Sequence, residues 1–360
     1  MQKVHTNSEG TSIGEMTNLS KTKHNQLQQQ VLILTVDEGS ESQRIDNYLA
    51  KHYKDVPKSH LYRILRSGEV RVNKKRVEAS YKLQLGDAVR IPPIKSLPKT
   101  SNISTSSKPI LQASVIFEDE ALLVINKPAG IAVHGGSGVS RGVIEQFRAE
   151  RPHAKFLELV HRLDKETSGV LMLAKKRAAL VALQEAIRRH ETDKRYLVLV
   201  AGVWKNEQQR VRLNLQKHTL ANGERKVTVV KSDPISKSSS HGIEVQHSET
   251  VFYLKQALGE FSLLEAHLVT GRTHQLRVQL AHLGFPIVGD EKYGNFELNK
   301  QLQKQGLKRM FLHSYRTIIQ HPLSKQTLEL EAPLPTELDL FITTISKKLS
   351  NQYEYATKKL

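Results

Sequence analysis

The sequence predicts an α+β fold in two parts: a small N-terminal helix-helix-hairpin module and a larger domain built on a mixed, mostly antiparallel sheet. The length of 360 residues suits about two domains of ~100 to 200 residues each. A stretch rich in Ser, Thr, Pro and Lys, residues 96–112, divides the chain and is expected to be a linker. After it, strand-like apolar runs outnumber helical patterns and do not alternate strictly with them, which argues against a doubly wound parallel sheet.

The composition indicates a soluble cytoplasmic protein whose partner carries phosphate. Lys and Arg number 54 against 36 Asp and Glu, a net charge of +18, and such an excess is typical of proteins that bind nucleic acid. The absence of cysteine excludes disulfides, a thiolate nucleophile and Cys-based zinc sites. No apolar run approaches the ~18 to 20 residues that cross a bilayer, so we expect no membrane association.

The N-terminal part is expected to contain a disordered tail, residues 1–30, followed by the module, residues 31–95. Apolar residues at helical spacing predict two short helices, the second with Ser59 as its N-cap and Gly68 as its left-handed C-terminal residue. The apolar positions of these helices are Ile45, Tyr48, Leu49, Leu61, Ile64 and Leu65. Alternating apolar residues then predict strands that close the module.

Positive charge is concentrated in the module. Residues 43–95 hold 13 Lys and Arg against five Asp and Glu, a net charge of +8. Charge alone is as consistent with a solvated face as with a surface that follows phosphates. The stretch SQRIDNYLAKHYKDVPKSHLYRILRSGEVRVNKKRV, however, resembles the S4-like RNA-binding module, in which the second helix and the following turn contact RNA. The resemblance implies RNA contacts by Lys58, Arg63, Arg66, Lys74, Lys75 and Arg76.

The larger domain is expected to span residues 113–345, followed by a basic tail, residues 346–360. Apolar runs predict strands at 114–117, 121–125, 170–173, 196–200, 261–269 and 316–319. Helical periodicity predicts helices at 143–151, 177–190 and 275–282. The sequence contains neither G-x-G-x-x-G nor G-x-x-x-x-G-K-[ST] nor H-E-x-x-H, so the usual marks of nucleotide cofactors and zinc hydrolases are absent.

Three segments combine charged or polar residues with turn signals and contain the candidate site residues: 126–134, 160–169 and 270–284. The second packs charged residues directly before an apolar strand, which places Asp164 at the rim of the core, where electric fields are strong. Spacing alone also allows Asp164 to cap the turn by accepting backbone hydrogen bonds. The arginines of the third segment are either solvated or clamp a carboxylate and phosphates.

Together, these three segments resemble the RluA family of RNA pseudouridine synthases. HRLDKETSG matches the catalytic loop of the family, NKPAGIAVH the preceding turn, and GRTHQLRVQLAHLG its arginine-bearing motif. The resemblance covers residues 113–335 and is greatest to the members that modify large-subunit ribosomal RNA. Gln279 departs from the family pattern, which commonly has His there, so an RNA contact at this position is in doubt.

The resemblance implies a uridine isomerase that needs no cofactor or metal. Asp164 would either attack C1′ as a nucleophile or remove the 2′ proton to give a glycal. Arg272 would pair with Asp164, with Arg277 as the alternative, and Arg277 would otherwise meet RNA. Arg162 would grip or wedge beside the RNA. Tyr196 would stack on the target base, although a Tyr that opens an apolar strand is more often a core residue.

The expected partner is large-subunit (23S) ribosomal RNA or a pre-ribosomal particle, bound by a monomer. The alternative is a non-catalytic RNA-binding or ribosome-assembly factor with the same fold. A complete set of Asp164, Arg272 and Tyr196 argues against that alternative, because a protein that only binds RNA has no use for a catalytic carboxylate.

Overall fold

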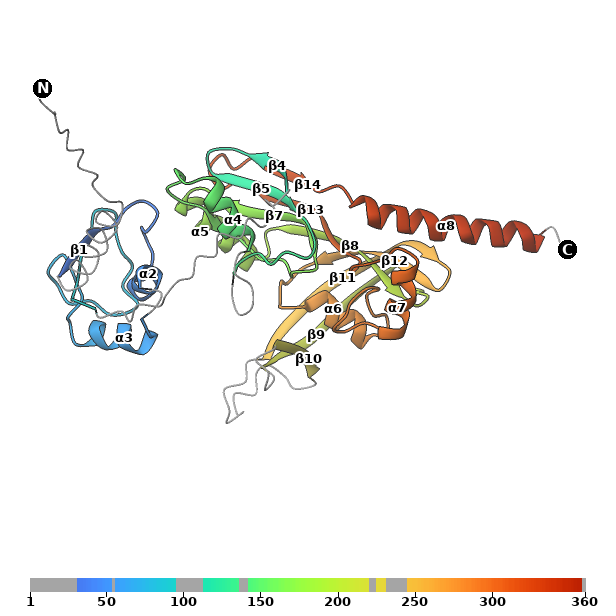
Figure 1. Cartoon of the computed structure of the whole chain (residues 1–360), viewed down its shortest axis with the longest axis horizontal. Coiled ribbons are helices and arrows are strands. Elements are labelled where there is room, and N and C mark those ends of the chain that lie inside the picture. Colours follow the sequence, from blue (N-terminus) through green and yellow to red (C-terminus); the bar gives the residue numbers. More distant parts are fainter. Residues whose placement is uncertain are drawn as a thin grey trace, which may run out of the picture. The chain divides into compact units, whose positions relative to one another are not determined.

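The computed structural model describes residues 31–53, 56–94, 113–135, 142–219, 225–230 and 245–357. The chain divides into two compact units, Met1–Lys108 and Pro109–Leu360, shown in Figure 1. The expected tail at 1–30 and linker at 96–112 lie outside the described residues. Among the helices of the described ranges, none is long and apolar enough to cross a membrane.

The first unit packs two helices against a small antiparallel sheet. Its elements are β1 (Leu32–Thr35), α2 (Ile45–His52), α3 (Lys58–Arg66), β2 (Arg71–Val72) and β3 (Ala88–Ile91), with sheet order β1-β3-β2. The predicted apolar positions of both helices are buried in one cluster, because they recur on one face at helical spacing. Ser59 is not the N-cap: α3 begins at Lys58 after Pro57, a residue whose fixed φ suits a helix start. Gly68 is left-handed as predicted, with φ +75°.

A tight turn after β2 presents the basic residues of the module. Asn73 and Lys74 both have positive φ, and the backbones of Val72 and Lys75 exchange hydrogen bonds across the turn. The Asn73 side chain donates to Asp87 Oδ1 at 2.7 Å and accepts from the Ala88 amide at 2.9 Å. Asn tolerates the left-handed region and these bonds hold it there, so the turn projects its lysines in a fixed direction.

The second unit is built on one mixed sheet, which in the described ranges has order β10-β9-β11-β12-β8-β13-β7-β5-β4, with β14 on β13 and β6 on β7. Its strands are β4 (Ser114–Glu118), β5 (Leu122–Lys127), β6 (Glu158–Leu159), β7 (Ser168–Ala174), β8 (Asp193–Ala201), β9 (Gln208–Thr219), β10 (Arg225–Val230), β11 (Val245–Leu258), β12 (Phe261–Leu268), β13 (Leu312–Gln320) and β14 (Thr327–Glu331). Between named strands, only β13 and β7 pair in parallel. The predicted mixed, mostly antiparallel sheet is confirmed.

Five helices accompany this sheet in the described ranges: α4 (Val143–Glu150), α5 (Arg177–Arg188), α6 (Gln275–His282), α7 (Phe296–Lys304) and α8 (Thr336–Thr357). The three predicted helices are confirmed to within two residues at each end. Helices α7 and α8 and strands β6, β9, β10, β11 and β14 were not predicted. Residues 346–357, which the sequence analysis assigned to a tail, are helical, because Leu338, Phe341 and Ile345 anchor the start of α8 in a buried cluster.

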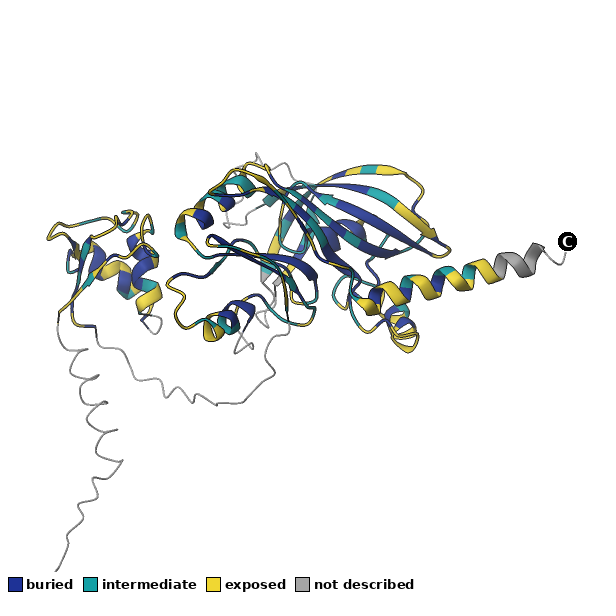
Figure 2. Cartoon of the chain, turned by 90° about the horizontal axis from the view of Figure 1, so that it is seen from above, coloured by how far each residue is buried: buried dark blue, intermediate teal, exposed yellow. Residues whose placement is uncertain are grey.

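The centre of the sheet is buried on both faces, as Figure 2 shows. Alternate residues of β7 belong to different clusters: Leu171 and Leu173 to the one that also contains residues of α4 and α6, and Val170 and Met172 to the one that contains residues of α5. Such double burial explains why β7 is a continuous apolar run. The loop at 160–167 therefore enters the core at a rigid point, the start of a fully buried strand.

Candidate active site

Asp164 lies in the loop between β6 and β7, four residues before the start of the fully buried strand β7. The loop is closed by a backbone hydrogen bond from the Thr167 amide to the Asp164 carbonyl oxygen, at 3.2 Å. The carboxylate is therefore not the cap of this turn, which was one of the two possibilities left by spacing. It accepts instead a hydrogen bond from Arg277 Nη1, at 3.1 Å to Oδ2.

Arg277, in the first turn of α6, is shared between two carboxylates. Besides contacting Asp164, its Nε and Nη2 donate to Asp290 Oδ2 and Oδ1 at 2.7 and 2.8 Å. Asp290 is 1% exposed, and its Oδ1 also accepts the amides of Lys292 and Tyr293. Burial lowers the pKa of Arg277, but the bonds and charges of Asp290 and Asp164 outweigh it, so the pKa lies above its usual range. The guanidinium is thus fixed in place and permanently charged.

Arg272 is not the ion-pair partner of Asp164, which corrects the first choice made from the sequence. It is exposed, and its Nε donates to the His247 carbonyl oxygen of β11 at 3.1 Å. Arg277, the alternative, holds the position next to Asp164 because α6 starts at Gln275 and directs residue 277 inward. Arg272 still lines the smaller of the two cavities at Asp164.

His274 adds an oriented N–H group to the site, a feature that the sequence analysis missed. It precedes α6 in the left-handed conformation, with φ +53°, and its Nδ1 lies 2.9 Å from the Tyr293 hydroxyl. That hydroxyl already accepts the Val227 amide, so we assign its proton to the bond with Nδ1. The neutral ring then carries its hydrogen on Nε2, which lies 3.9 Å from Asp164 Oδ2. Burial lowers the pKa of His274, which favours this neutral form.

Residues of the segment 126–134 hold the Asp164 loop in place through hydrogen bonds. Lys127 is fully buried, and its ammonium donates to the carbonyl oxygens of Pro128, Ile131 and Lys165 at 2.8, 2.8 and 3.1 Å. The Gly130 amide also donates to the Lys165 oxygen, at 2.9 Å. Burial, followed by the charge of Arg309, lowers the pKa of Lys127 to about 7. The turn at 126–134 thus positions the loop, and does not itself offer a reactive group.

A second network holds the other end of the loop. Arg309 Nη2 donates to Ser168 Oγ at 2.7 Å and to the Glu166 carbonyl oxygen at 3.4 Å. Ser168 Oγ lies 2.8 Å from His313 Nδ1, and His313 Nε2 lies 3.1 Å from the Ala332 oxygen. Burial lowers the pKa of His313 to about 4, so the ring is neutral and its bonds are directional. Asp164 is therefore fixed from both sides.

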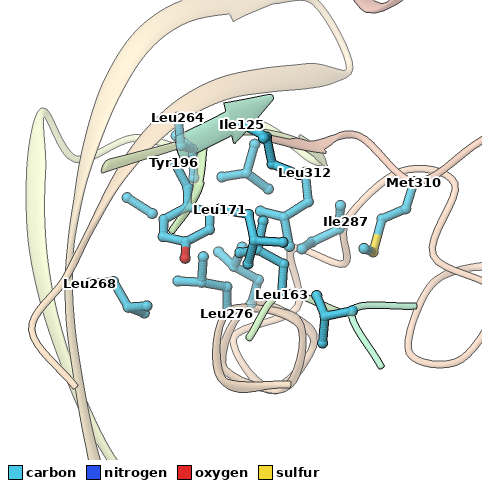
Figure 3. Packing of buried hydrophobic residues seen from close by; sticks show 14 of the residues in the cluster. Ile125, Leu163, Leu171, Tyr196, Leu264, Leu268, Leu276, Ile287, Met310 and Leu312 are labelled. Carbon is cyan, nitrogen blue, oxygen red and sulfur yellow. The ribbon is translucent and has the colours of Figure 1, made fainter. Parts of the chain in front are cut away.

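Tyr196 on β8 is a core residue that also faces the site. It is 6% exposed and packs with Leu163, Leu276 and Leu312, as Figure 3 shows. Burial raises the pKa of its hydroxyl to about 12. The same side chain lines a cavity of about 110 Å³ together with Asp164. The two roles weighed from the sequence, core packing and contact with a base, are therefore compatible in this structure.

Two cavities meet at Asp164. The small one is lined mainly by Tyr196 and leucines on one side and by the segment 271–277 on the other. The large one, about 820 Å³, is lined by residues of the Asp164 loop, α6, β10 and the segments at 289–292 and 308–310. Asp164, Arg277 and the exposed Arg162 line both. A ligand that reaches Asp164 can therefore occupy a small, partly apolar space and a large, charged one.

The six cations predicted in the first unit are all exposed on α3 and the adjoining turn. Arg63 is paired with Glu69 at 3.1 Å, which reduces its net charge toward solvent. Arg76 donates to the Arg66 carbonyl oxygen and packs over Gly68. The side chains of Lys58, Lys74 and Lys75 form no hydrogen bond or ion pair with the residues that the structure describes.

Two further arginines of the module gather at the end of α3, and the sequence analysis missed them. Arg71 Nε donates to the Gly68 oxygen at 3.3 Å, and Arg90 Nη1 to the Glu69 oxygen at 2.9 Å. The carbonyl end of a helix attracts cations, which explains why guanidinium groups gather there. Their strand positions gave no sign of this, because the contact depends on the β2–β3 register.

Gln279 is fully buried and cannot contact RNA. Its Oε1 accepts from Thr250 Oγ1 at 2.7 Å, and its Nε2 donates to Ser248 Oγ at 3.0 Å. The departure from the family pattern therefore lies between α6 and β11, where it ties the helix to the sheet.

Comparisons with known proteins agree with this arrangement. Residues 121–282 match the family model for RNA pseudouridylate synthase, and residues 43–89 match the S4 domain. A protein of Pasteurella multocida named ribosomal large subunit pseudouridine synthase C is 46% identical over 328 residues, which are 90% of this chain and 97% of the relative. The protein of the same name from Haemophilus influenzae is 45% identical, covering 88% and 96%.

Solved structures show the same fold. Human RNA pseudouridylate synthase domain containing 1 superposes with a TM-score of 0.51 at 24% identity, covering 65% of this chain and 89% of that one. Human RNA pseudouridylate synthase domain containing 4 gives a TM-score of 0.50 at 25% identity, covering 64% and 92%.

Proposed function

Because the chain belongs to the RNA pseudouridylate synthase family, we propose that it isomerises uridines of large-subunit ribosomal RNA to pseudouridine, with Asp164 as the catalytic carboxylate. The observation that carries this proposal is the pair of Asp164 and a buried, immobilised Arg277 at the meeting point of two cavities. The choice of RNA is supported by the names of the relatives, which act on the ribosomal large subunit.

The reaction asks for one charged carboxylate near the ribose. The bond between N1 and C1′ of the uridine breaks, the base turns, and C5 bonds to C1′, so base and ribose stay the same in composition. Asp164 either attacks C1′ or removes the 2′ proton, and both routes need its ionised form. Arg277 supplies a positive charge beside this carboxylate, with its Nη1 3.1 Å from Asp164 Oδ2.

The small cavity suits the uracil ring. Reaching C1′ requires the target nucleotide to leave its stack, at a cost of a few kcal/mol. Stacking on an aromatic side chain returns roughly 1 to 3 kcal/mol, and Tyr196 offers such a surface beside Asp164. His274 Nε2–H points to the same region and can donate a hydrogen bond to substrate. Arg162, exposed at the rim, can grip the displaced strand.

The S4 domain supplies sequence-independent affinity through phosphates. Lys58, Lys74 and Lys75 are free to bind phosphate oxygens, and the anchored arginines at the end of α3 present further N–H groups. We further propose that the protein works as a monomer in the cytoplasm, where bacterial ribosomal RNA is modified. Light scattering on the purified chain tests whether the protein is a monomer.

The decisive experiment compares Asp164→Asn with the wild type on transcribed large-subunit ribosomal RNA. Pseudouridine is mapped by carbodiimide modification and primer extension, which also identifies the target uridines. We expect no product from Asp164→Asn while RNA affinity stays within a few-fold. Glu166→Gln, which removes a carboxylate two residues away, serves as the matched control and should retain the product. Normal product from Asp164→Asn would refute the assignment.

A further inference from the structure

Three cations line the large cavity without a protein partner. All three residues, Arg162, Lys226 and Lys308, are exposed, and their side chains make no hydrogen bond or ion pair with any residue in the described part of the chain. They come from separate segments: the Asp164 loop, β10 and the loop before β13. Like charges that converge on one space repel each other, so their meeting needs a reason outside the folding of the domain.

The acidic residues of the cavity leave this excess uncompensated. Asp164 and Asp290 share Arg277, and Glu166 lies 3.7 Å from Lys165. Arg309 has its own partner, Glu337, at 3.3 Å. The fourth carboxylate of the cavity, Glu291, is exposed. Seven Lys and Arg side chains thus face four carboxylates, and this excess leaves Lys226 and Lys308 available to a bound anion.

Lys308 also connects the large cavity to a third one. This cavity, about 830 Å³, lies against the turn at 126–130 and the start of α8, and it shares Glu166, Lys308 and Arg309 with the large cavity. Each of the two spaces approaches the upper end of the range for small-molecule pockets, roughly 300 to 1,000 Å³. The two cavities therefore adjoin beside the Asp164 loop, and together they offer more space than a single nucleotide would fill.

We propose that Lys226 and Lys308 bind the phosphates of nucleotides that flank the target uridine, in a single-stranded track formed by these two cavities. The proposal rests on the proposed function and deepens it, because it assigns the strand next to the extruded base to named residues of the catalytic domain. Charged grooves of this kind follow the RNA backbone without reading sequence. The S4 domain binds other phosphates of the RNA, and specificity for the target site does not depend on these two lysines.

Salt titration of RNA binding tests the proposal. Lys226→Ala, Lys308→Ala and the double variant are compared with Lys217→Ala and Lys300→Ala, two exposed lysines of the same unit that line none of the three cavities. Dissociation constants for a large-subunit ribosomal RNA transcript are measured over a series of KCl concentrations. Replacing either Lys226 or Lys308 by Ala should reduce the slope of log Kd against log salt concentration by about 0.7 to 0.9. The controls should leave the slope unchanged.

Uncharged linkages in the RNA backbone test whether the two lysines contact the phosphates next to the target uridine. Methylphosphonate linkages on either side of the target uridine, in a short RNA that the wild type modifies, should weaken wild-type binding but leave the double variant unaffected.

The outcomes separate the track from the proposed function. An unchanged salt slope in the double variant, or an equal change in the control variants, overturns the track even if the wild type makes pseudouridine. If the wild type makes no pseudouridine, the proposed function fails, and the salt slopes still report whether these lysines bind RNA. Thermal unfolding of every variant confirms that the slopes compare folded proteins.

Discussion

Asp290 is the residue whose role in the site is least visible in the sequence. It holds Arg277 by two hydrogen bonds, whereas Asp164 accepts only one from the same guanidinium. Because the Asp290 carboxylate is buried and bound to Arg277, we expect it to act through Arg277 as a positioning residue. Misplacing a catalytic group by about 1 Å can cost on the order of 100-fold in rate, which sets the scale of the effect.

Asp290→Asn should lower kcat by about 10- to 100-fold with RNA affinity nearly unchanged. Its Oδ1 can still accept the amides of Lys292 and Tyr293, so the local fold is retained, but the bond to Arg277 Nε is lost. Single-turnover kinetics on ribosomal RNA measure the change. Glu297→Gln on the neighbouring α7 removes an exposed carboxylate and should have no effect.

A double-mutant cycle distinguishes positioning from general damage to the fold. If Asp290 acts only through Arg277, then adding Asp290→Asn to Arg277→Ala should produce no further loss of kcat. A further loss equal to that of the single variant would show that Asp290 contributes independently.

Lys127 makes the stability of the protein depend on pH in the alkaline range. Its pKa is lowered from 10.5 to about 7 by burial, so between these values the unfolded chain binds more protons than the folded one. Stability should therefore rise as pH increases from 7 toward 10, by at most about 1.4 kcal/mol per unit, and this contribution to the slope should vanish below pH 7.

Urea unfolding of the wild type and Lys127→Met at several pH values measures this dependence. The variant loses three hydrogen bonds and should be less stable throughout, so the comparison is between slopes. Equal slopes in both proteins would mean that Lys127 stays charged in the folded state.

At the scale of elements, the sequence predicted what repeats locally and missed what depends on distant partners. Strand β7 was found because it is an uninterrupted apolar run, and helix α5 because its apolar residues recur at helical spacing. Strand β9 was missed because only part of its length is buried, which weakens alternation in its sequence. Helix α8 was hidden by its basic end, although its first half buries three apolar residues.

The candidate site follows the same rule. Asp164 and Tyr196 were identified from short motifs, whereas the pairing of Asp164 with Arg277 instead of Arg272 depends on where α6 begins. The backbone at His274 decides this, because it adopts the left-handed conformation directly before the helix. A pattern of residue types carries no information on such a single dihedral angle, and the same holds for Asp290, which lies 13 residues after Arg277.

Gly169 joins two elements at the base of the Asp164 loop. It has φ +112°, and a Cβ at this position would lie 2.1 Å from the Ser314 carbonyl oxygen of β13. Gly169→Ala should therefore displace the parallel pairing of β7 and β13. The free energy of unfolding should fall by more than the ~1 to 2 kcal/mol that left-handed strain alone would cost. Gly306→Ala is the matched control, because Gly306 has φ +101° but nothing within 4 Å of its Cβ.

Chemical denaturation measures both glycine variants. We expect the loss in Gly169→Ala to exceed that in Gly306→Ala by at least about 2 kcal/mol, since backbone at so short a distance cannot yield as a flexible side chain can. Comparable losses would show that the strand pair tolerates the added methyl group.

At the scale of the whole molecule, the net charge of +18 is divided between two units with different tasks. In the catalytic domain, many cations are bound to carboxylates or carbonyl oxygens and hold the site together. In the S4 domain, Lys58, Lys74 and Lys75 have no partner in the described residues and face solvent. We therefore expect the S4 domain to contribute to RNA affinity without contributing to the chemical step.

Replacing Lys58, Lys74 and Lys75 together by Ala in the full chain should weaken RNA binding and flatten its salt dependence by about 2, since each phosphate contact contributes about 0.7 to 0.9 to the slope. At saturating RNA, kcat should stay within about two-fold of wild type, because Asp164 and Arg277 are untouched. The control replaces three lysines of α7 and α8 by Ala, namely Lys300, Lys304 and Lys347. This change lowers the net charge by the same amount. If that control flattens the slope as much, the effect comes from total charge, and the S4 domain has no special place in binding.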